Sequence, residues 1–207
     1  MLFERDGLAV AVIYSVGMGK AGKSGAAKAR VISSRVAYHG PVFSVTTDDV
    51  HEPGGVRTRR DVVRHSGSIV VLAVNNHLSE PEILLERQYR HAARSMMWEL
   101  PAGRIDDGEG ELAAAKRELL EETGYTARRW KKLLHFFVSP GFLDETMAIY
   151  RAQELKAGTA RPEADEKIQT RFVPLSRAVR MVGSGQIRDA KTIAGVLWFA
   201  RTAKTSR

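Results

Sequence analysis

The stretch that decides the fold of this chain runs from Gly103 to Tyr125 and reads GRIDDGEGELAAAKRELLEETGY. Its second part has helical spacing and is rich in residues that favour helices, so we expect a helix over Gly110 to Thr123. Gly124 follows as the natural C-terminal stop. The stretch therefore predicts an acidic helix that is entered through a glycine-containing loop.

The carboxylates of this helix are spaced to lie together. Glu118 is three and four positions from Glu121 and Glu122, and such positions share one helical face. Glu109 lies in the loop just before the helix and can join them. Four carboxylates so close repel one another unless positive charge lies among them. Arg117 supplies part of it and is expected to pair with Glu121, and the remainder calls for a hard divalent cation, Mg²⁺ or Mn²⁺.

A solvated acidic surface helix is the alternative interpretation, and the spacing argues against it. The pattern is Gly, five residues, Glu, seven residues, Arg-Glu-Leu, one residue, Glu-Glu, one residue, Gly and a final apolar position. At every defining position it resembles the Nudix box, with Tyr125 in place of the more usual aliphatic residue. A pattern with this many fixed positions is a specific signal.

The resemblance extends beyond the box, towards the ADP-ribose pyrophosphatase branch of the Nudix hydrolases. It covers roughly Ser33 to Ala203. Three segments carry it: Trp98-Glu99-Leu100-Pro101-Ala102-Gly103 before the box, Ser139-Pro140-Gly141 with Asp144-Glu145 after it, and Asp189-Ala190-Lys191-Thr192 near the end.

The resemblance implies a set of metal ligands. Glu118, Glu122 and the carbonyl of Ala102 would bind the divalent metal, with Glu121 as a shared or supporting ligand. Glu109 would be a further supporting carboxylate. Arg117 would orient the glutamates through charge-assisted hydrogen bonds. The metal would neutralise diphosphate oxygens and activate a water nucleophile.

The box does not supply a general base. In similar enzymes the base often comes from an acidic loop between late strands, which here is Pro162-Glu163-Ala164-Asp165-Glu166-Lys167. Glu166 is the first choice, as base or as an added metal ligand, and Glu163 is the second. A solvated loop charge is the alternative interpretation.

Several residues are candidates for binding the substrate. Arg87 and Arg90 end a predicted strand that should point towards the diphosphate, which a planar guanidinium grips with two hydrogen bonds. Arg90 is the better candidate, with a structural ion pair as the alternative. Glu99 could reach either ribose hydroxyls or the metal cluster. The other candidates are Pro140, Gly141 and Glu145 for the terminal ribose, and Tyr38 or Phe43 for stacking on adenine.

Composition sets limits on the class of protein. The 207 residues carry a formal net charge of +8, contain no cysteine and include no run of eighteen apolar residues. A disulfide scaffold, a cysteine nucleophile and a thiolate metal site are thereby excluded, and no transmembrane helix is expected. The basic balance suits an anionic partner. We expect a cytoplasmic protein that acts on a small nucleotide and binds neither nucleic acid nor a membrane.

The rest of the chain predicts an α+β fold, the Nudix α/β/α sandwich with a mixed sheet. Residues 1–30 read as an extension, residues 31–66 as a small N-terminal β subdomain and residues 67–207 as the hydrolase domain. In similar enzymes the β subdomain exchanges with a partner, so a homodimer is expected. The expected strands are Val36–Tyr38, Val42–Val45, Val56–Val63, Ser68–Val74, Glu82–Tyr89, Leu133–Val138, Thr146–Ala152 and Lys167–Val173, and the late helices are Leu175–Gly183 and Ala190–Ala203.

A second nucleotide motif competes for attention. Gly17 to Ser24 reads GMGKAGKS and matches the glycine-rich loop that cradles phosphates in P-loop proteins. Such a loop needs a parallel sheet and a following helix, whereas the chain after Arg30 is taken up by the other pattern. A glycine- and lysine-rich arm is the interpretation adopted for this segment.

The expected reaction is hydrolysis of ADP-ribose to AMP and ribose 5-phosphate. Another nucleoside diphosphate sugar or a dinucleotide is an alternative substrate for the same box. A sensor that binds ADP-ribose without turnover is an alternative from a different class, disfavoured by the intact glutamates. Clean-up of RNA caps or nucleoside triphosphates is disfavoured by Pro140, which resembles the branch's substrate marker.

Overall fold

The computed structural model describes residues 29–76, 79–161 and 167–204 of the chain. The segment Gly17–Ser24 and nearly all of the expected extension 1–30 lie outside these residues. The strands are β1 Arg30–His39, β2 Ser44–His51, β3 Arg57–Arg64, β4 Ser68–Asn75, β5 Glu82–Arg90, β6 Ser95–Glu99, β7 Ala102–Arg104, β8 Tyr125–Phe137, β9 Thr146–Ala157 and β10 Gln169–Pro174. The helices are α1 Glu111–Thr123, α2 Leu175–Gly183 and α3 Ala190–Lys204.

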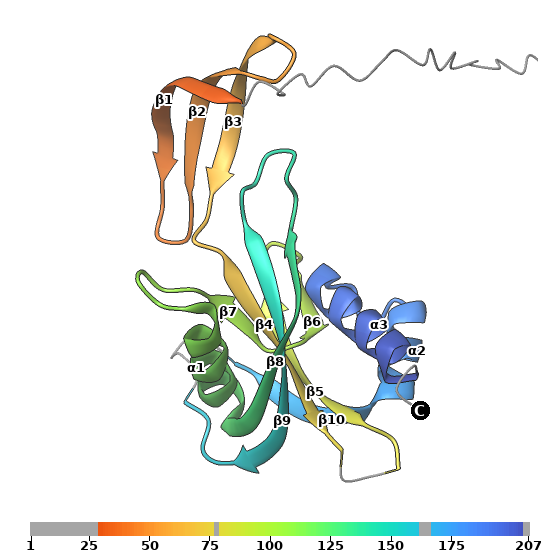
Figure 1. The fold of residues 1–207 in the computed structure, drawn as a ribbon. Helices are drawn as coiled ribbons and strands as arrows, with labels where there is room; N and C mark the ends of the chain where they lie inside the picture. The colour runs from red at the N-terminus through yellow and green to blue at the C-terminus, as the bar shows by residue number, and fades with distance from the viewer. Residues whose placement is uncertain (1–28, 77–78, 162–166, 205–207) are drawn as a thin grey trace, which may run out of the picture.

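The main sheet is mixed and forms the middle layer of the body. Its strand order is β10-β5-β4-β9-β8, with β6 paired to β5 and β7 paired to β4. The pair β4 and β9 is parallel and the other pairs are antiparallel. Figure 1 shows α1 on one face of this sheet and α2 with α3 on the other. The expected α+β sandwich with a mixed sheet is confirmed.

Alternate residues of β4 supply the two cores, because successive side chains of a strand point to opposite faces. Val70, Leu72 and Val74 pack in the core that α2 and α3 cover. Ile69 and Val71 pack in the core on the side of α1. All five are almost completely buried, so the strand reads as a continuous apolar run rather than an alternating one.

The strands β1, β2 and β3 form a separate three-stranded antiparallel sheet, which stands off from the body in Figure 1. Every residue of β1 is exposed. The central strand carries the buried Asp48, which accepts a hydrogen bond from Ser34 Oγ (2.6 Å) and forms an ion pair with Arg64. These two partners, together with the hydroxyl of Thr46, hold the pKa of Asp48 below its usual value in spite of burial. Polar side chains therefore help to hold this sheet together.

The end of β3 is joined to the tip of the hairpin between β8 and β9. The Val63 amide donates to the Phe142 carbonyl (2.8 Å), and the Asp144 amide donates to the Val63 carbonyl (3.1 Å). The Asp144 carboxylate in turn accepts hydrogen bonds from the His65 amide (2.9 Å) and from Arg64 Nη1 (3.1 Å). The small sheet and the hairpin tip are thus connected through backbone and side chain together.

Several predicted strand boundaries were wrong. The second strand begins at Ser44, not Val42, and continues through the acidic residues to His51, because Asp48 is satisfied by Ser34 and Arg64. The strand expected at Leu133 begins at Tyr125. Its polar first half is held in the sheet by antiparallel pairing with β9, which itself continues to Ala157. Tertiary pairing here overrides local polarity.

Three polar side chains are buried in the sheet on the face of α1, at the ends of β5 and β6. Glu86 and Glu99 are 0% and 1% exposed and form a direct cross-strand pair. Gln88 Nε2 donates to Glu86 Oε1 (2.8 Å), whereas Glu86 Oε2 has no hydrogen-bond partner among the described residues. Burial and the neighbouring charge of Glu99 raise the pKa of Glu86 to about 7.

Among the described residues, no helix combines the length and the apolarity that crossing a membrane requires.

Replacing Gly124 by alanine should destabilise the protein. Gly124 ends α1 with a φ of 74°, and a Cβ there would lie 2.6 Å from the Ala160 amide nitrogen. The left-handed backbone and the close contact together cost about 2 kcal/mol, to be measured by urea unfolding. Gly183→Ala is the matched control, because Gly183 ends α2 with nothing within 4 Å of its would-be Cβ. Equal stability of the two variants would contradict this account.

Replacing Glu86 by glutamine should stabilise the protein more at high pH than at low pH. Because the folded pKa, about 7, exceeds the ordinary 4.5, ionisation of Glu86 opposes folding. The penalty is absent below pH 4.5, grows up to pH 7 and is constant above it. The gain from Glu86→Gln between pH 4.5 and pH 8 should reach as much as about 3 kcal/mol in the free energy of unfolding. Glu82→Gln, which removes a partly exposed carboxylate from the same strand, is the control. A gain that does not change with pH would refute the prediction.

Candidate active site

The helix α1, which carries the box glutamates, packs on the main sheet through its inner face. Ala114, Ala115 and Leu119 are completely buried against it. Glu122 lies in the last turn of the helix and is only 5% exposed, although it is a carboxylate. The helix therefore brings an acidic group to the sheet at its C-terminal end, where β7 runs beside it.

Two glutamates flank the segment that enters the box. The Ala102 amide donates to Glu122 Oε2 (3.1 Å). A Cβ placed on Gly103 would lie 1.9 Å from Glu118 Oε1, so the Glu118 carboxylate occupies the space of a side chain at position 103. Only glycine permits this approach. Glu118, Glu122 and Ala102, three of the predicted metal ligands, are thus brought together.

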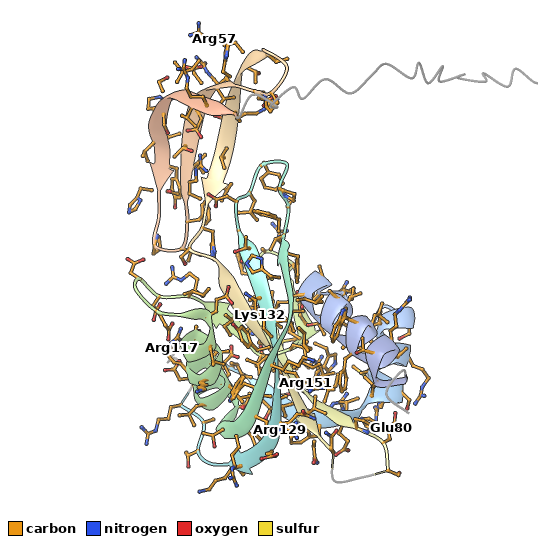
Figure 2. All side chains as sticks on the ribbon, viewed as in Figure 1. Arg57, Glu80, Arg117, Arg129, Lys132 and Arg151 are labelled. Carbon is orange, nitrogen blue, oxygen red and sulfur yellow. The ribbon has the colours of Figure 1, made fainter. Side chains whose placement is uncertain are left out.

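Arg117 binds the remaining acidic groups of the box. Its guanidinium donates to Glu109 (2.9 and 3.1 Å), to Glu118 Oε1 (2.7 Å) and to Glu121 Oε2 (3.1 Å). The expected pair with Glu121 is therefore present. Figure 2 shows Arg117 on α1, away from α2 and α3. These hydrogen bonds, with Glu109 first, raise the pKa of Arg117, and Arg117 holds the pKa of Glu109 below its usual value.

The charge of this cluster suits a divalent cation. Glu109, Glu118, Glu121 and Glu122 carry four negative charges if ionised, and Arg117 supplies one positive charge. Among the described residues no three acidic or histidine side chains form a closed cluster around a common point. The donors are nevertheless hard carboxylate oxygens beside a backbone segment, which is the ligand type that Mg²⁺ and Mn²⁺ prefer. The type of donor therefore suits such an ion, although the described side chains do not by themselves form a three-ligand group.

The predicted phosphate ligand Arg90 is held by a buried anchor. Its Nε and Nη2 donate to the two oxygens of Glu99 (3.0 and 2.8 Å). The side chain of Glu99 is 2% exposed and that of Arg90 is 41% exposed. The guanidinium of Arg90 is therefore held by a buried carboxylate and still reaches solvent. Hydrogen bonding to Glu99 raises the pKa of Arg90, and Glu86 and Glu122 contribute through their charge. Arg90 therefore lies on the face of the sheet that α1 covers, because it is six positions along β5 from Leu84, which packs in the core on that side.

Glu99, predicted as a substrate residue, has both oxygens occupied. Lys191 at the start of α3 donates to Glu99 Oε2 (2.5 Å), beside the two bonds from Arg90. Burial alone would raise the pKa of Glu99, but Arg90 and Lys191 outweigh it and hold the pKa low. A ribose hydroxyl would have to compete with two cations for this carboxylate. The contacts indicate that Glu99 supports Arg90.

Arg87 lies on the other face of the sheet. It is paired in register with Trp98 and lies 5.7 Å from the centre of that ring, while Arg171 stacks on the same ring at 4.1 Å. Trp98 packs against the core that α2 and α3 cover. Within one chain, the structure does not bring the predicted phosphate contact Arg87 to the glutamates of α1.

The hairpin tip that contains Pro140 and Gly141 faces the small sheet. Together with Glu52 and the β3 residues Arg60 and Val62, it lines a cavity of about 300 Å³. The predicted ribose ligand Glu145 accepts a hydrogen bond from Ser68 Oγ (2.6 Å) and lies 3.7 Å from His65 Nδ1. Glu145 is therefore bound to the first residue of β4 and is not exposed at the loop tip.

The two aromatic candidates for adenine stacking lie together. Tyr38 and Phe43 are exposed, with ring centroids 5.6 Å apart. Phe43 lines a cavity of about 530 Å³ between the turn of the small sheet and the box residues Arg104 to Asp107. Arg104 Nη1 donates to the Pro41 carbonyl (2.7 Å) across this cavity.

The two candidate bases, Glu163 and Glu166, lie outside the described residues. The chain enters their segment beside the glutamate helix, because the Arg161 amide donates to the Glu121 carbonyl (2.8 Å).

Sequence reasoning missed three residues of the site region. Lys191 stands in a quoted motif, but the motif alone did not assign it a partner. Glu86 was passed over as part of an apolar strand, and His65 gave no signal at all. The partners of Lys191 and His65 lie far away in sequence, so local spacing does not predict them.

The comparisons with known proteins agree with this geometry. A family model described as NUDIX domain matches residues 64–195. The chain is 36% identical to ADP-ribose pyrophosphatase of Bacillus subtilis over 172 residues, which are 82% of this chain and 91% of the relative. It is 37% identical to ADP-ribose pyrophosphatase of Mycobacterium tuberculosis over 170 residues, 80% of each chain.

A solved structure titled as an ADP compounds hydrolase has the same fold. It superposes with a TM-score of 0.74 at 20% sequence identity, covering 86% of this chain and 96% of the other. The family model spans the box, the flanking strands and the first turn of α3, which are the elements that assemble the glutamates, Arg90 and Lys191. This chain belongs to the Nudix family.

Proposed function

We propose that this protein hydrolyses the diphosphate of ADP-ribose, giving AMP and ribose 5-phosphate. The observation that carries the proposal is the convergence of Glu118 and Glu122 on the Ala102–Gly103 segment, with Arg90 on the face of the sheet that α1 covers. The names of the two relatives support the choice of substrate. The substrate is a small nucleotide, and neither nucleic acid nor a membrane takes part.

The metal ligands would be Glu118, Glu122 and the Ala102 carbonyl, with Glu121 and Glu109 in support. Mg²⁺ is the proposed ion, and Mn²⁺ a substitute. When bound, the ion neutralises diphosphate oxygens and lowers the pKa of a coordinated water. Arg117, which now binds three of the carboxylates, keeps them oriented.

The protein's own residues perform the remaining tasks. Arg90 binds and orients the diphosphate through the guanidinium hydrogens that Glu99 does not use. A water oxygen forms a bond to one phosphorus, and the bond from that phosphorus to the bridging oxygen breaks. Glu166, or failing it Glu163, accepts the proton of the water. Pro140, Gly141 and Glu145 border the terminal ribose.

Two alternatives remain for the same site. Another nucleoside diphosphate sugar or a dinucleotide would be cut by the same groups, because the chemistry involves only the diphosphate. A sensor would bind ADP-ribose and leave it intact. The intact set of box glutamates favours catalysis, since a sensor can lose them.

We also propose that the protein works as a homodimer in the cytoplasm, with residues 31–66 as an N-terminal β subdomain that exchanges between partners and residues 67–207 as the hydrolase domain. The small sheet exposes several large apolar side chains. Its exposed large apolar side chains are Val31, Ile32, Val36, Tyr38, Val42, Phe43 and Val56. Such a patch is typical of an interaction surface.

Glu122→Gln should abolish turnover of a substrate panel. With Mg²⁺ present, the wild-type protein is offered ADP-ribose, ADP-glucose, GDP-mannose, NADH and a nucleoside triphosphate, and release of the nucleoside monophosphate is measured. ADP-ribose should be preferred, and the variant should lose about a hundredfold or more in kcat, because it loses a charged metal ligand. Preference for another compound of the panel would change the assigned substrate and leave the proposed mechanism in place. Binding of ADP-ribose without any turnover would establish the sensor instead.

The same assay tests the base. Glu166→Gln should lower kcat with little change in KM, whereas Glu163→Gln should have a smaller effect. Wild-type kcat in both variants would exclude this loop as the source of the base.

The wild-type protein should have twice the 22.9 kDa mass of one chain in light scattering. The double variant Val36→Lys with Tyr38→Lys places charge on the exposed patch and should be monomeric. Gln186→Lys with Leu197→Lys, which places charge on two exposed positions outside the small sheet, is the control and should remain dimeric. A monomeric wild-type protein would refute the proposed dimer.

A further inference from the structure

The first turn of α3 reaches across to the strand that enters the box. Asp189 Oδ2 accepts hydrogen bonds from the amide and the hydroxyl of Thr192 (3.0 and 2.5 Å). Thr192 Oγ1 in turn accepts a hydrogen bond from the Leu100 amide (2.8 Å). Lys191 lies between them and contacts both Glu99 Oε2 (2.5 Å) and Asp189 Oδ1 (3.1 Å). The start of this helix is therefore fastened to the end of β6.

Lys191 is unusual for a lysine because its side chain is only 10% exposed. Lysine is almost never buried without a partner, and ordering its long side chain costs conformational entropy. Its ammonium group is directed at the carboxylate that already anchors Arg90. A surface ion pair would leave the lysine side chain in solvent, so it does not explain why Lys191 is buried. The burial of its ammonium group therefore needs another explanation.

The charge balance beneath Arg90 supplies that reason. Glu99 lies opposite Glu86 in the register of β5 and β6, and both carboxylates are buried. Gln88 satisfies one oxygen of Glu86, and the other has no partner among the described residues. Two buried acidic groups thus lie beside two cations, Arg90 and Lys191, and Lys191 also contacts Asp189 at the start of α3. Without Lys191, Arg90 would be the single cation beside two buried carboxylates.

We propose that Lys191 is a positioning residue for the hydrolysis, because it balances the buried pair Glu86 and Glu99 and so leaves the guanidinium of Arg90 available to the substrate diphosphate. The proposal rests on the proposed function in one respect, that Arg90 binds the diphosphate. It gives the Asp189-Ala190-Lys191-Thr192 motif a role in substrate affinity, although α3 lies on the face of the sheet opposite α1.

The way in which Glu99 binds one edge of the Arg90 guanidinium agrees with this role of Lys191. Glu99 engages Nε and Nη2 and leaves Nη1 uncommitted to it. A second uncompensated carboxylate at Glu86 would attract the same guanidinium inward. Since the attraction of Arg90 for phosphate acts in the ground state and the transition state alike, its loss changes KM rather than kcat.

The test compares Lys191→Met with the wild-type protein. KM for ADP-ribose should rise at least tenfold, with kcat within about threefold. Lys191→Arg should restore KM to within threefold. The dissociation constant of ADP-ribose, measured in metal-free buffer where no hydrolysis occurs, should rise by a similar factor in Lys191→Met.

Lys132→Met is the matched control. Lys132 on β8, labelled in Figure 2, donates to Glu111 Oε2 (2.6 Å), so it also joins two elements through one lysine-glutamate pair. It should lower the melting temperature without changing KM. An equal rise of KM in Lys132→Met would show that a general loss of stability is responsible, and would overturn the proposal.

The double variant Lys191→Met with Glu86→Gln makes the test specific. It removes one cation and one carboxylate together, so KM should return to within threefold of the wild-type value, and the protein should fold even if Lys191→Met alone does not. A KM that stays high would overturn the proposal, as would an unchanged KM and dissociation constant in Lys191→Met.

The outcome for Lys191 is separable from that for the substrate. If the wild-type protein prefers another nucleoside diphosphate derivative, KM is measured on that compound and the same pattern is expected. If it turns over nothing, the metal-free dissociation constant of ADP-ribose decides.

Discussion

The Glu118 carboxylate lies where a side chain at position 103 would otherwise be, and the site depends on this contact. It sets how closely α1 approaches β7, because the helix cannot move nearer without a clash or away without losing the carboxylate from the backbone. Glu122 is then placed on the Ala102 amide one turn further along. The close packing of the helix core on the sheet keeps this arrangement rigid.

The features that follow from short-range spacing were predictable. The extent of α1, its stop at Gly124 and the pair of Arg117 with Glu121 all follow from residues a few positions apart. The opposite facing of Arg87 and Arg90 was also within reach, because an odd separation in a strand puts side chains on opposite faces. The prediction treated the two arginines as neighbours and overlooked this.

Other features depend on partners distant in sequence and were not predictable from spacing. Lys191 and Glu99 are 92 positions apart, and Ser68 and Glu145 are 77 apart. The polar first half of β8 has no strand-like pattern and is ordered by its neighbour β9. In each case the contact depends on the topology that brings two segments together, which local propensity does not predict.

The junction between the small sheet and the hairpin tip has a consequence for how the protein can diverge. Val63, Arg64 and His65 are hydrogen-bonded directly to Phe142 and Asp144, so β3 and the tip are one continuous piece of structure. None of these bonds involves α1. Substitutions that tilt the small sheet therefore reshape the rim around Pro140 while the glutamates keep their spacing. The recognition surface can drift independently of the chemistry, which is the freedom a family needs to serve many substrates with one set of metal ligands.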